Sequence, residues 1–205
     1  MKWDQFQQLI DFSLKDKQLE QLQKLQELLL RYNSKHNLIS PKDEPVVLER
    51  HLQDSLTPLR WIRKIEGPHL DFGSGTGFPL LPLAIAQPYR PFVAVESRSR
   101  RVLQMKHLAN QIGIQNIEWR NSTIEQFIEE RKGGRLYTSV TARAVSSLEK
   151  DAERAYSVMK SGGRFVTFKS AFPEQPPKNF KMEWWSYQLH PDLKEYYSIC
   201  LEKLR

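Results

Sequence analysis

A glycine-rich segment at residues 71–79 is the part of this chain whose residue types and spacing best suit ligand chemistry. Its sequence is Asp-Phe-Gly-Ser-Gly-Thr-Gly-Phe-Pro, and it follows an expected short strand and opens an expected helix. Glycines permit a tight turn and let a ligand approach the main chain. The N-terminus of a helix adds free N–H groups. The segment therefore predicts a loop that holds a ligand against its backbone.

The spacing of the three glycines distinguishes two classes of ligand. A dinucleotide-binding loop has the pattern G-x-G-x-x-G, but Phe78 stands at the position of its third glycine and would obstruct close helix–strand packing. The G-x-G-x-G spacing of Gly73, Gly75 and Gly77 instead resembles that of class I methyltransferases, in which the methionine part of S-adenosylmethionine passes over the loop. Asp71, just before the glycines, suits a ligand that carries an ammonium group.

Two further segments suit the adenosine part of such a cofactor. Glu96, followed by Ser97, ends the next buried apolar run, where a carboxylate can accept hydrogen bonds from both ribose hydroxyls. The alternative is an ordinary surface glutamate, but the end of a buried strand at a topological switch point favours binding. Further along, Ile124 can pack on the adenine ring, while Ser122 and Glu125 also fit a helix capping box.

An alternation of strand-like and helix-like segments, from Gly67 onward, must position these residues. The expected strands are 70–72, 92–95, 117–119, 137–141 and 164–169, and the expected helices are 80–86, 102–112, 124–130 and 148–159. We expect the last helix to stop at Gly162-Gly163. The alternation predicts an α/β fold with a doubly wound, Rossmann-like parallel sheet. Segments 184–189 and 196–201 predict an antiparallel hairpin, joined at His190-Pro191, at one edge of that sheet.

Residues 1–66 have a helical pattern and predict an N-terminal extension in front of a cofactor-binding domain at 67–205. Trp3 and Phe6 begin a short apolar segment, and apolar residues then recur every three or four positions between Leu19 and Tyr32. Residues 33–43 predict a loop, and residues 48–62 a third helix.

Composition narrows the classes of function. The net charge of +7 and pI near 9.5 suit a phosphate backbone, although many soluble proteins are mildly basic. Cys200 is the only cysteine, which excludes a disulfide framework and a multi-cysteine zinc site, and we expect no metal. No apolar run approaches the ~20 residues needed to cross a bilayer. We expect a cytoplasmic protein with no membrane partner, assumed to be a monomer.

The motifs on either side of the glycine loop are similar to those of a known family. Over residues 28–170 the chain resembles the bacterial 16S ribosomal RNA guanine-N7 methyltransferases, the glucose-inhibited division protein B family. The resemblance rests on Tyr32-Asn33, Asn37-Leu38, Arg50-His51-Leu52-Gln53-Asp54-Ser55-Leu56, the glycine loop, Val95-Glu96-Ser97, Ala142-Arg143-Ala144-Val145, Lys160-Ser161-Gly162-Gly163-Arg164 and Lys169.

This resemblance implies an enzyme that methylates guanine N7 in 16S RNA or in the small ribosomal subunit. It implies that Gly73, Phe78, Ile124, Glu125 and Arg143 contact S-adenosylmethionine, and the types and positions of the residues add Asp71, Ser74, Gly75, Gly77, Glu96 and Ser97. The resemblance also implies that His51, Asp54 and Arg143 border the guanine, and Asn37, Ser55, Pro79 and Lys169 are further candidates for contact with the substrate. Arg100 and Arg101 suit contact with RNA phosphates, and a solvated helix face is the alternative for them.

The implied reaction needs no general base. Guanine N7 has an in-plane lone pair and no proton, so it can attack the sulfonium methyl directly, and catalysis reduces to orientation. We therefore expect Arg143, His51 and Asp54 to position groups, with Arg143 on the guanine edge or on the cofactor carboxylate. His51, Asp54 and Ser55 lie within one helical turn, and a polar cluster that docks this helix is the alternative.

Three other functions stay open from the sequence. The chain could methylate a small molecule or a protein, it could be a dinucleotide-dependent oxidoreductase, or it could bind RNA without catalysis. The glycine spacing disfavours the oxidoreductase, and the intact loop with Glu96 and Arg143 disfavours the non-catalytic protein. Only a substrate assay separates the different methyltransferases.

Overall fold

The computed structural model of the chain describes residues 3, 6, 12–131, 134, 136–143, 145–172, 175–189 and 194–204. Most of the short N-terminal segment, the junction His190-Pro191 and Ala144 lie outside the described residues.

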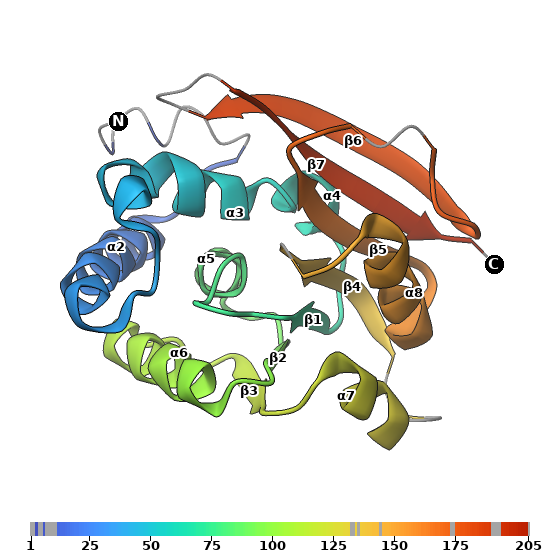
Figure 1. The fold of residues 1–205 in the computed structure, drawn as a ribbon, viewed down its shortest axis with the longest axis horizontal. Helices are drawn as coiled ribbons and strands as arrows, with labels where there is room; N and C mark the ends of the chain where they lie inside the picture. The colour runs from blue at the N-terminus through green and yellow to red at the C-terminus, as the bar shows by residue number, and fades with distance from the viewer. Residues whose placement is uncertain are drawn as a thin grey trace.

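A seven-stranded sheet forms the centre of the fold, in the order β3-β2-β1-β4-β5-β7-β6 (Figure 1). The strands are β1 (His69–Phe72), β2 (Phe92–Val95), β3 (Ile117–Arg120), β4 (Tyr137–Ala142), β5 (Met159–Lys169), β6 (Phe180–Leu189) and β7 (Lys194–Lys203). The first five are parallel, and β7 runs antiparallel to both β5 and β6. The predicted parallel sheet with an antiparallel hairpin at one edge is confirmed. Within the hairpin, β7 lies next to β5, and β6 is the edge strand.

Helices cover both faces of the sheet, and every residue of β1 and β2 is buried between them. On one face, α5 (Leu80–Ala86) and α6 (Ser99–Ile112) share a hydrophobic cluster with Phe92 and Ala94. On the other face, α7 (Ile124–Glu130) and α8 (Leu148–Val158) pack with Leu70 and Phe72 (Figure 1). This is the doubly wound architecture that the alternation of segments predicts.

The end of α8 differs from expectation. The helix stops at Val158, and Gly162-Gly163 lies inside β5, so the predicted glycine stop is wrong. Met159 is already extended and pairs with Tyr137, and the register then shifts before Ser139. A Cβ on Gly163 would lie 2.8 Å from the carbonyl oxygen of Lys160. The glycine pair therefore permits an irregularity in a strand that begins earlier than predicted.

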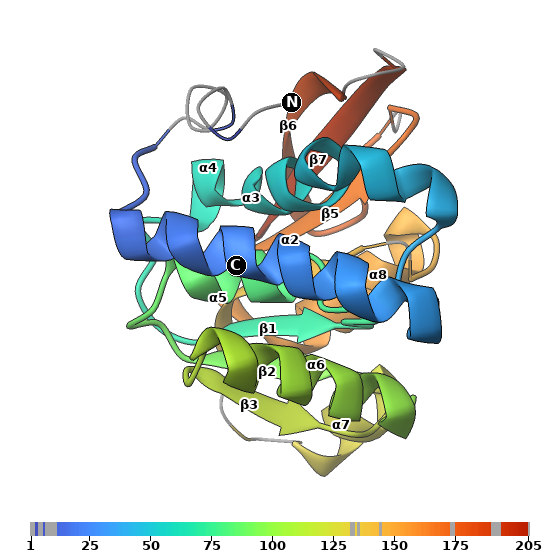
Figure 2. The same ribbon diagram turned by 90° about the vertical axis from the view of Figure 1, so that its left-hand side faces the viewer.

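The N-terminal extension packs against the face that carries α5 and α6. Helix α2 (Asp16–His36) ends at Asn37, which has a left-handed backbone, and it contacts α5 and α6 (Figure 2). Leu22 and Leu25 of α2 belong to the same hydrophobic cluster as the residues of α5. The extension and the sheet are thus held together by a common core.

The segment predicted as a loop followed by one helix is built from shorter elements. A 3-10 helix, η1 (Pro41–Val46), occupies the end of the expected loop. The expected helix is divided into the π-helical η2 (Leu48–Gln53), α3 (Asp54–Leu56) and α4 (Leu59–Ile62). Pro58 lacks the N–H that a continuous helix needs at this point. The π turn carries His51, and such turns are frequent at functional sites.

Candidate functional site

The glycine loop follows β1 at the carboxyl edge of the sheet. Strand β1 pairs with β2 on one side and β4 on the other, so the loop lies at the topological switch point. Gly73 N donates to Val95 O at 2.8 Å, and Gly77 N donates to Ser74 O at 2.7 Å. Gly73, Gly75 and Gly77 all have positive φ. A Cβ on Gly73 would lie 2.5 Å from Val145 Cγ2, so this position of the loop requires glycine.

Asp71 is fully buried below this loop and leaves one carboxylate oxygen free. Its Oδ1 accepts from Thr141 Oγ1 at 2.6 Å. Its Oδ2 has no hydrogen-bond partner among the described residues. Burial is the main reason that the pKa of Asp71 is raised to about 6. A buried carboxylate with a free oxygen fits a ligand that carries an ammonium group.

A buried chain of hydrogen bonds supports Asp71 from the far end of the sheet. Arg90 Nη2 donates to Ser139 Oγ at 2.7 Å, and Ser139 Oγ lies 2.6 Å from His69 Nδ1. His69 Nε2 lies 2.9 Å from Thr141 Oγ1, which donates to Asp71. Since Thr141 donates to the carboxylate, its oxygen accepts from His69 Nε2, and His69 Nδ1 then accepts from Ser139. Each hydrogen bond of this series therefore donates in the direction of Asp71.

Glu96 is held rigidly beside the loop. Its Oε2 accepts from Gly75 N at 2.8 Å, and its Oε1 accepts from Arg98 N at 2.9 Å and Arg98 Nε at 3.0 Å. Burial alone would raise the pKa of Glu96, but these hydrogen bonds hold it below its ordinary value. The carboxylate is therefore ionised at neutral pH. Because Oε1 already has two donors, two ribose hydroxyls could bind only if the exposed Arg98 side chain moved. Ser97 is exposed, and its carbonyl accepts from Asn121.

The start of α7 places Ile124 in the core and Glu125 at the surface. Thr123, not Ser122, caps this helix: Thr123 Oγ1 accepts from Gln126 N, and Gln126 Oε1 accepts from Thr123 N. The predicted Ser122–Glu125 capping box is wrong because the helix begins one residue later. Glu125 instead pairs with Arg154 at 2.6 Å and is 58% exposed.

Arg143, directly after β4, joins the glycine loop to the N-terminal extension. Its Nη1 donates to Asp54 Oδ2 at 3.0 Å, and its Nη2 lies 3.2 Å from His51 Nδ1. The guanidinium carbon lies 5.5 Å from the centroid of the Phe78 ring, and the His51 ring lies 5.1 Å from the same ring. The structure thus brings together four predicted site residues: His51, Asp54, Phe78 and Arg143. Two of the five N–H groups of Arg143 are used in these contacts, and three remain for a ligand.

The charge states of this cluster favour positioning over proton transfer. Burial and then the charge of Arg143 lower the pKa of His51 to about 3, so its ring is neutral at physiological pH. Burial raises the pKa of Asp54, and Arg143 and Tyr187 oppose that shift. The His51 Nε2 atom has no hydrogen-bond partner among the described residues, and the carboxylate of Asp43 lies 3.6 Å from it.

The other predicted substrate residues lie around this cluster at different depths. Ser55 and Pro79 are buried, and the Ser55 hydroxyl has no hydrogen-bond partner in the described chain. Lys169 ends β5, and its Nζ donates to Ser146 O at 3.4 Å. Arg101 Nη2 donates to the carbonyl of Asn37, which is exposed. Arg100 is exposed near the start of α6, and Ser74 Oγ donates to Asp71 O.

Sequence reasoning missed Tyr187, which the hairpin brings to this site. Its hydroxyl donates to Asp54 Oδ1, 133 positions away along the chain. Burial and the charge of Asp54 raise the pKa of Tyr187, so the hydroxyl keeps its proton. The alternation of Trp185, Tyr187 and Leu189 along β6 could have indicated that these side chains share one face. No sequence signal could have named Asp54 as the partner.

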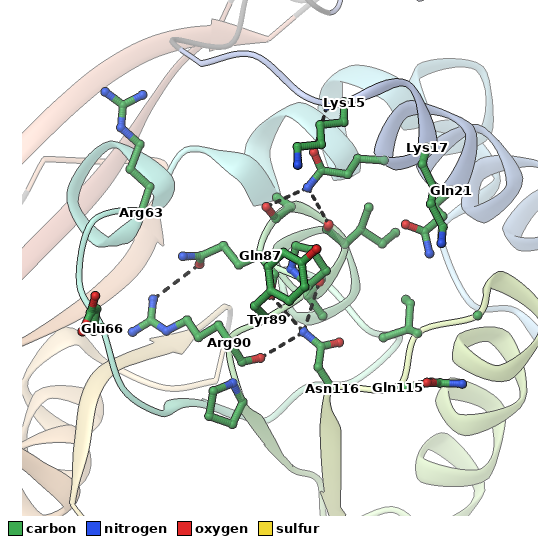
Figure 3. Close-up of a pocket in the computed structure, with 18 of the residues that line it drawn as sticks. Lys15, Lys17, Gln21, Arg63, Glu66, Gln87, Tyr89, Arg90, Gln115 and Asn116 are labelled. Atoms are coloured by element: carbon green, nitrogen blue, oxygen red, sulfur yellow. Dashed lines mark hydrogen bonds between the residues drawn. The ribbon is translucent and has the colours of Figure 1, made fainter.

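A cavity of about 1010 Å³ lies at the opposite, amino edge of the sheet (Figure 3). Lys15, Arg63 and Tyr89 line it, but two of its half-buried polar side chains are already hydrogen-bonded to backbone carbonyls. Asn116 Nδ2 donates to three carbonyls, and Gln18 Nε2 donates to Ile85 O and Ala86 O at the end of α5. These contacts join the extension to the sheet, and none of the predicted site residues lines the cavity.

The described residues contain no group of three or more His, Cys, Asp or Glu side chains arranged for a metal ion. Within the same part of the chain, no helix has the length and apolar character needed to span a membrane.

Comparisons with known proteins point to one family. Residues 18–195 match the family model of rRNA small subunit methyltransferase G, GidB. The Ribosomal RNA small subunit methyltransferase G of Staphylococcus carnosus is 35% identical over 167 residues, covering 80% of this chain and 70% of that protein. The protein of the same name from Staphylococcus haemolyticus is 34% identical over 203 residues, covering 94% and 84%.

Solved structures support the fold. A SAM-dependent O-methyltransferase from Thermotoga maritima has a TM-score of 0.57 at 16% identity, covering 86% of this chain and 71% of that one. A precorrin-6y C5,15-methyltransferase from Geobacter metallireducens has a TM-score of 0.56 at 12% identity, covering 82% and 91%. The chain has the class I methyltransferase fold, as predicted.

Proposed function

Because this chain belongs to the rRNA small subunit methyltransferase G family, we propose that it transfers a methyl group from S-adenosylmethionine to N7 of a guanine in 16S ribosomal RNA. The RNA is either free or part of a small ribosomal subunit, and a cytoplasmic location is part of the proposal. The observation that carries it is the Arg143 cluster, which sets a partly engaged guanidinium beside the glycine loop.

The residues around the loop suit the cofactor. The free Oδ2 of Asp71 accepts the ammonium group, and the main chain at Gly73 and Gly75 lies under the methionine part. Glu96 accepts from the ribose once the exposed Arg98 side chain has moved, and the adenine lies at the start of α7, beside Ile124. When bound, S-adenosylmethionine supplies an electrophilic methyl group on a sulfonium.

On the substrate side, Arg143 orients the guanine. Its remaining N–H groups donate to O6, the acceptor beside N7, or to the cofactor carboxylate. Asp54 and His51 fix the guanidinium in place, and the Phe78 ring supports it. Preorganised geometry of this kind supplies several kcal/mol of rate enhancement by orientation alone.

No residue accepts a proton in the chemical step. The N7 lone pair forms the new N–C bond, the C–S bond breaks, and its electron pair stays on sulfur. The positive charge moves to the guanine ring, and no proton leaves. A neutral His51, with a pKa of about 3, fits this scheme because a base so weak takes no proton at physiological pH.

The test is methyl transfer from labelled S-adenosylmethionine to 16S RNA and to small subunits from cells that lack this protein, followed by nucleoside analysis. We expect the label in 7-methylguanosine. Cofactor binding without label in either RNA substrate would overturn the ribosomal proposal, and a small molecule or a protein would become the substrate to test.

A further inference from the structure

Three aromatic side chains form a cluster on the C-terminal hairpin. The centroid of the Phe172 ring lies 4.9 Å from that of Trp184 and 5.5 Å from that of Tyr197, and Trp184 and Tyr197 are 6.4 Å apart. Phe172 is 41% exposed and Trp184 is 52% exposed. Adjoining exposed rings mark a surface for interaction more often than a lone exposed one does. We call Phe172, Trp184 and Tyr197 the aromatic platform.

The platform lies on the face of the hairpin turned away from the N-terminal extension. Side chains alternate between the two faces of a strand. On β6, Trp185 packs under Arg60, with the guanidinium carbon 4.3 Å from the ring centroid, and Tyr187 reaches Asp54. On β7, Ser198 accepts from Thr57. Trp184 and Tyr197 therefore point to the opposite face. The aromatic residues on one face of the hairpin pack against the N-terminal extension, and the aromatic residues on the other face remain accessible to a partner.

The platform is continuous with the Arg143 site. Tyr197 pairs across the sheet with Lys169, the last residue of β5. Lys169 Nζ donates to Ser146 O, in the segment that follows Arg143. Between β4 and β6 lie three strand spacings, roughly 15 Å in all. A polymer whose reacting base lies at Arg143 reaches the platform with its neighbouring units, and a small molecule does not.

We propose that the aromatic platform stacks on unpaired bases next to the guanine that reaches Arg143. The proposal rests on the proposed function and adds a second contact to it. Stacking on aromatic rings binds single-stranded RNA with little dependence on sequence. The charge of Lys169, which pairs with Tyr197 across the sheet, and the net charge of +7 complement the phosphate backbone. These charges favour RNA over an apolar protein segment as the occupant.

The test is steady-state methyl transfer with Trp184→Ala, varying RNA and cofactor separately. Loss of one stacked base predicts a rise of roughly 5- to 150-fold in KM for protein-free 16S RNA. We expect KM for the cofactor and kcat at saturating RNA to stay within about twofold, because no platform residue belongs to the glycine loop or the Arg143 cluster. Trp184→Phe keeps a stacking ring and is expected to restore most of the affinity for RNA.

Tyr89→Ala is the matched control. Tyr89 is 93% exposed and lines the cavity at the amino edge (Figure 3), far from Arg143 along the strands. We expect it to change neither KM. An equal rise for Tyr89→Ala would overturn the proposal, because the effect would then follow from losing any exposed aromatic ring.

Other outcomes are equally decisive. An unchanged KM for RNA in Trp184→Ala and Phe172→Ala overturns the platform and leaves the proposed function intact. A KM raised for small subunits but not for protein-free RNA also overturns it, since the platform would then contact a ribosomal protein. Wild-type protein that methylates no RNA refutes the proposed function itself, before any variant is compared.

A measurement on the wild-type protein covers the case in which a variant fails to fold. RNA carrying 5-iodouracil on either side of the target guanine is irradiated in complex with the protein, and the cross-linked peptides are identified. Cross-links at residues 172, 184 or 197 support the platform. Cross-links confined to other segments overturn it.

Discussion

The two edges of the sheet differ in whether buried polar atoms are left without a hydrogen bond. At the amino edge, Arg90 donates to Gly67 O, Ile62 O and Ser139 Oγ, and Asn116 donates to three carbonyls. At the carboxyl edge, Asp71 Oδ2 and His51 Nε2 are buried without a hydrogen-bond partner among the described residues.

An unpaired buried polar group costs free energy that folding alone does not recover. The paired groups at the amino edge are therefore expected to serve stability, and the unpaired atoms at the carboxyl edge to serve a ligand. Both edges also contain a buried charge, with different consequences. Burial lowers the pKa of Arg90 to about 10, which leaves it charged at neutral pH, whereas it raises the pKa of Asp71 to about 6.

The largest effect is expected at the amino edge, from Arg90→Met. This change keeps an unbranched side chain but leaves several buried acceptors without a donor, at a cost of about 3 kcal/mol in the free energy of unfolding. The melting temperature should fall by about 6–12 °C. Calorimetry measures the loss, and the dissociation constant for S-adenosylmethionine should stay unchanged in the folded fraction.

Lys17→Met is the control for Arg90→Met because it removes an exposed cation from the rim of the same cavity. We expect its stability to stay within about 0.5 kcal/mol of wild type. A loss of cofactor affinity in Arg90→Met without loss of stability would contradict the division between the two edges.

At the carboxyl edge, Asp71→Asn should weaken cofactor binding by about 30- to 150-fold, or 2–3 kcal/mol, and yet stabilise the protein. The folded pKa of about 6 lies above the unfolded value near 3.8, so protonation favours the folded state. This contribution is complete below pH 4 and is lost as pH rises through 6. At pH 8 the ionised carboxylate therefore destabilises the fold, and the amide should relieve about 1–2 kcal/mol of the roughly 3 kcal/mol cost.

Calorimetric titration with S-adenosylmethionine and thermal unfolding at pH 5 and pH 8 measure the two effects of Asp71→Asn. In the wild type, cofactor affinity should decline as pH is lowered through about 6, because Asp71 gains a proton, and the variant should lack this step. Asp16→Asn, at an exposed helix start, is the control. A variant less stable than wild type at pH 8 would show that Asp71 is a structural group.

The smallest of the three effects is expected from Tyr187→Phe, which removes only the hydroxyl that donates to Asp54. With less restraint on Asp54 and Arg143, kcat should fall about tenfold, or about 1.4 kcal/mol, while KM for the cofactor stays unchanged. Tyr196→Phe, on the neighbouring strand, serves as the control. Loss of stability with unchanged kcat would show that Tyr187 only holds the hairpin against the N-terminal extension.

The parts of the site that depend on local sequence could be predicted. Gly73, Gly75 and Gly77 set their own turn, and β2 is a short apolar run whose burial follows from composition. The parallel direction of the first five strands follows from their alternation with helices. These features require little knowledge of distant residues.

The parts that depend on distant pairing could not be predicted. Met159 becomes extended because Tyr137 pairs with it, which overrides the helical pattern of the preceding residues. The π turn at His51 and the contact between Tyr187 and Asp54 depend on how the extension meets the hairpin. Arg143 could be named from a family motif, but the groups that hold it could not.

The position of β7 between β5 and β6 bears on how the protein is synthesised. Thr57, near the start of the chain, donates to Ser198 on the last described strand. Until β7 emerges from the translating ribosome, β5 is an open edge available to other chains. The Asp54–Tyr187 contact also closes a long loop in the chain, which slows folding. A nascent polypeptide is therefore expected to need protection from aggregation until translation of the hairpin is complete.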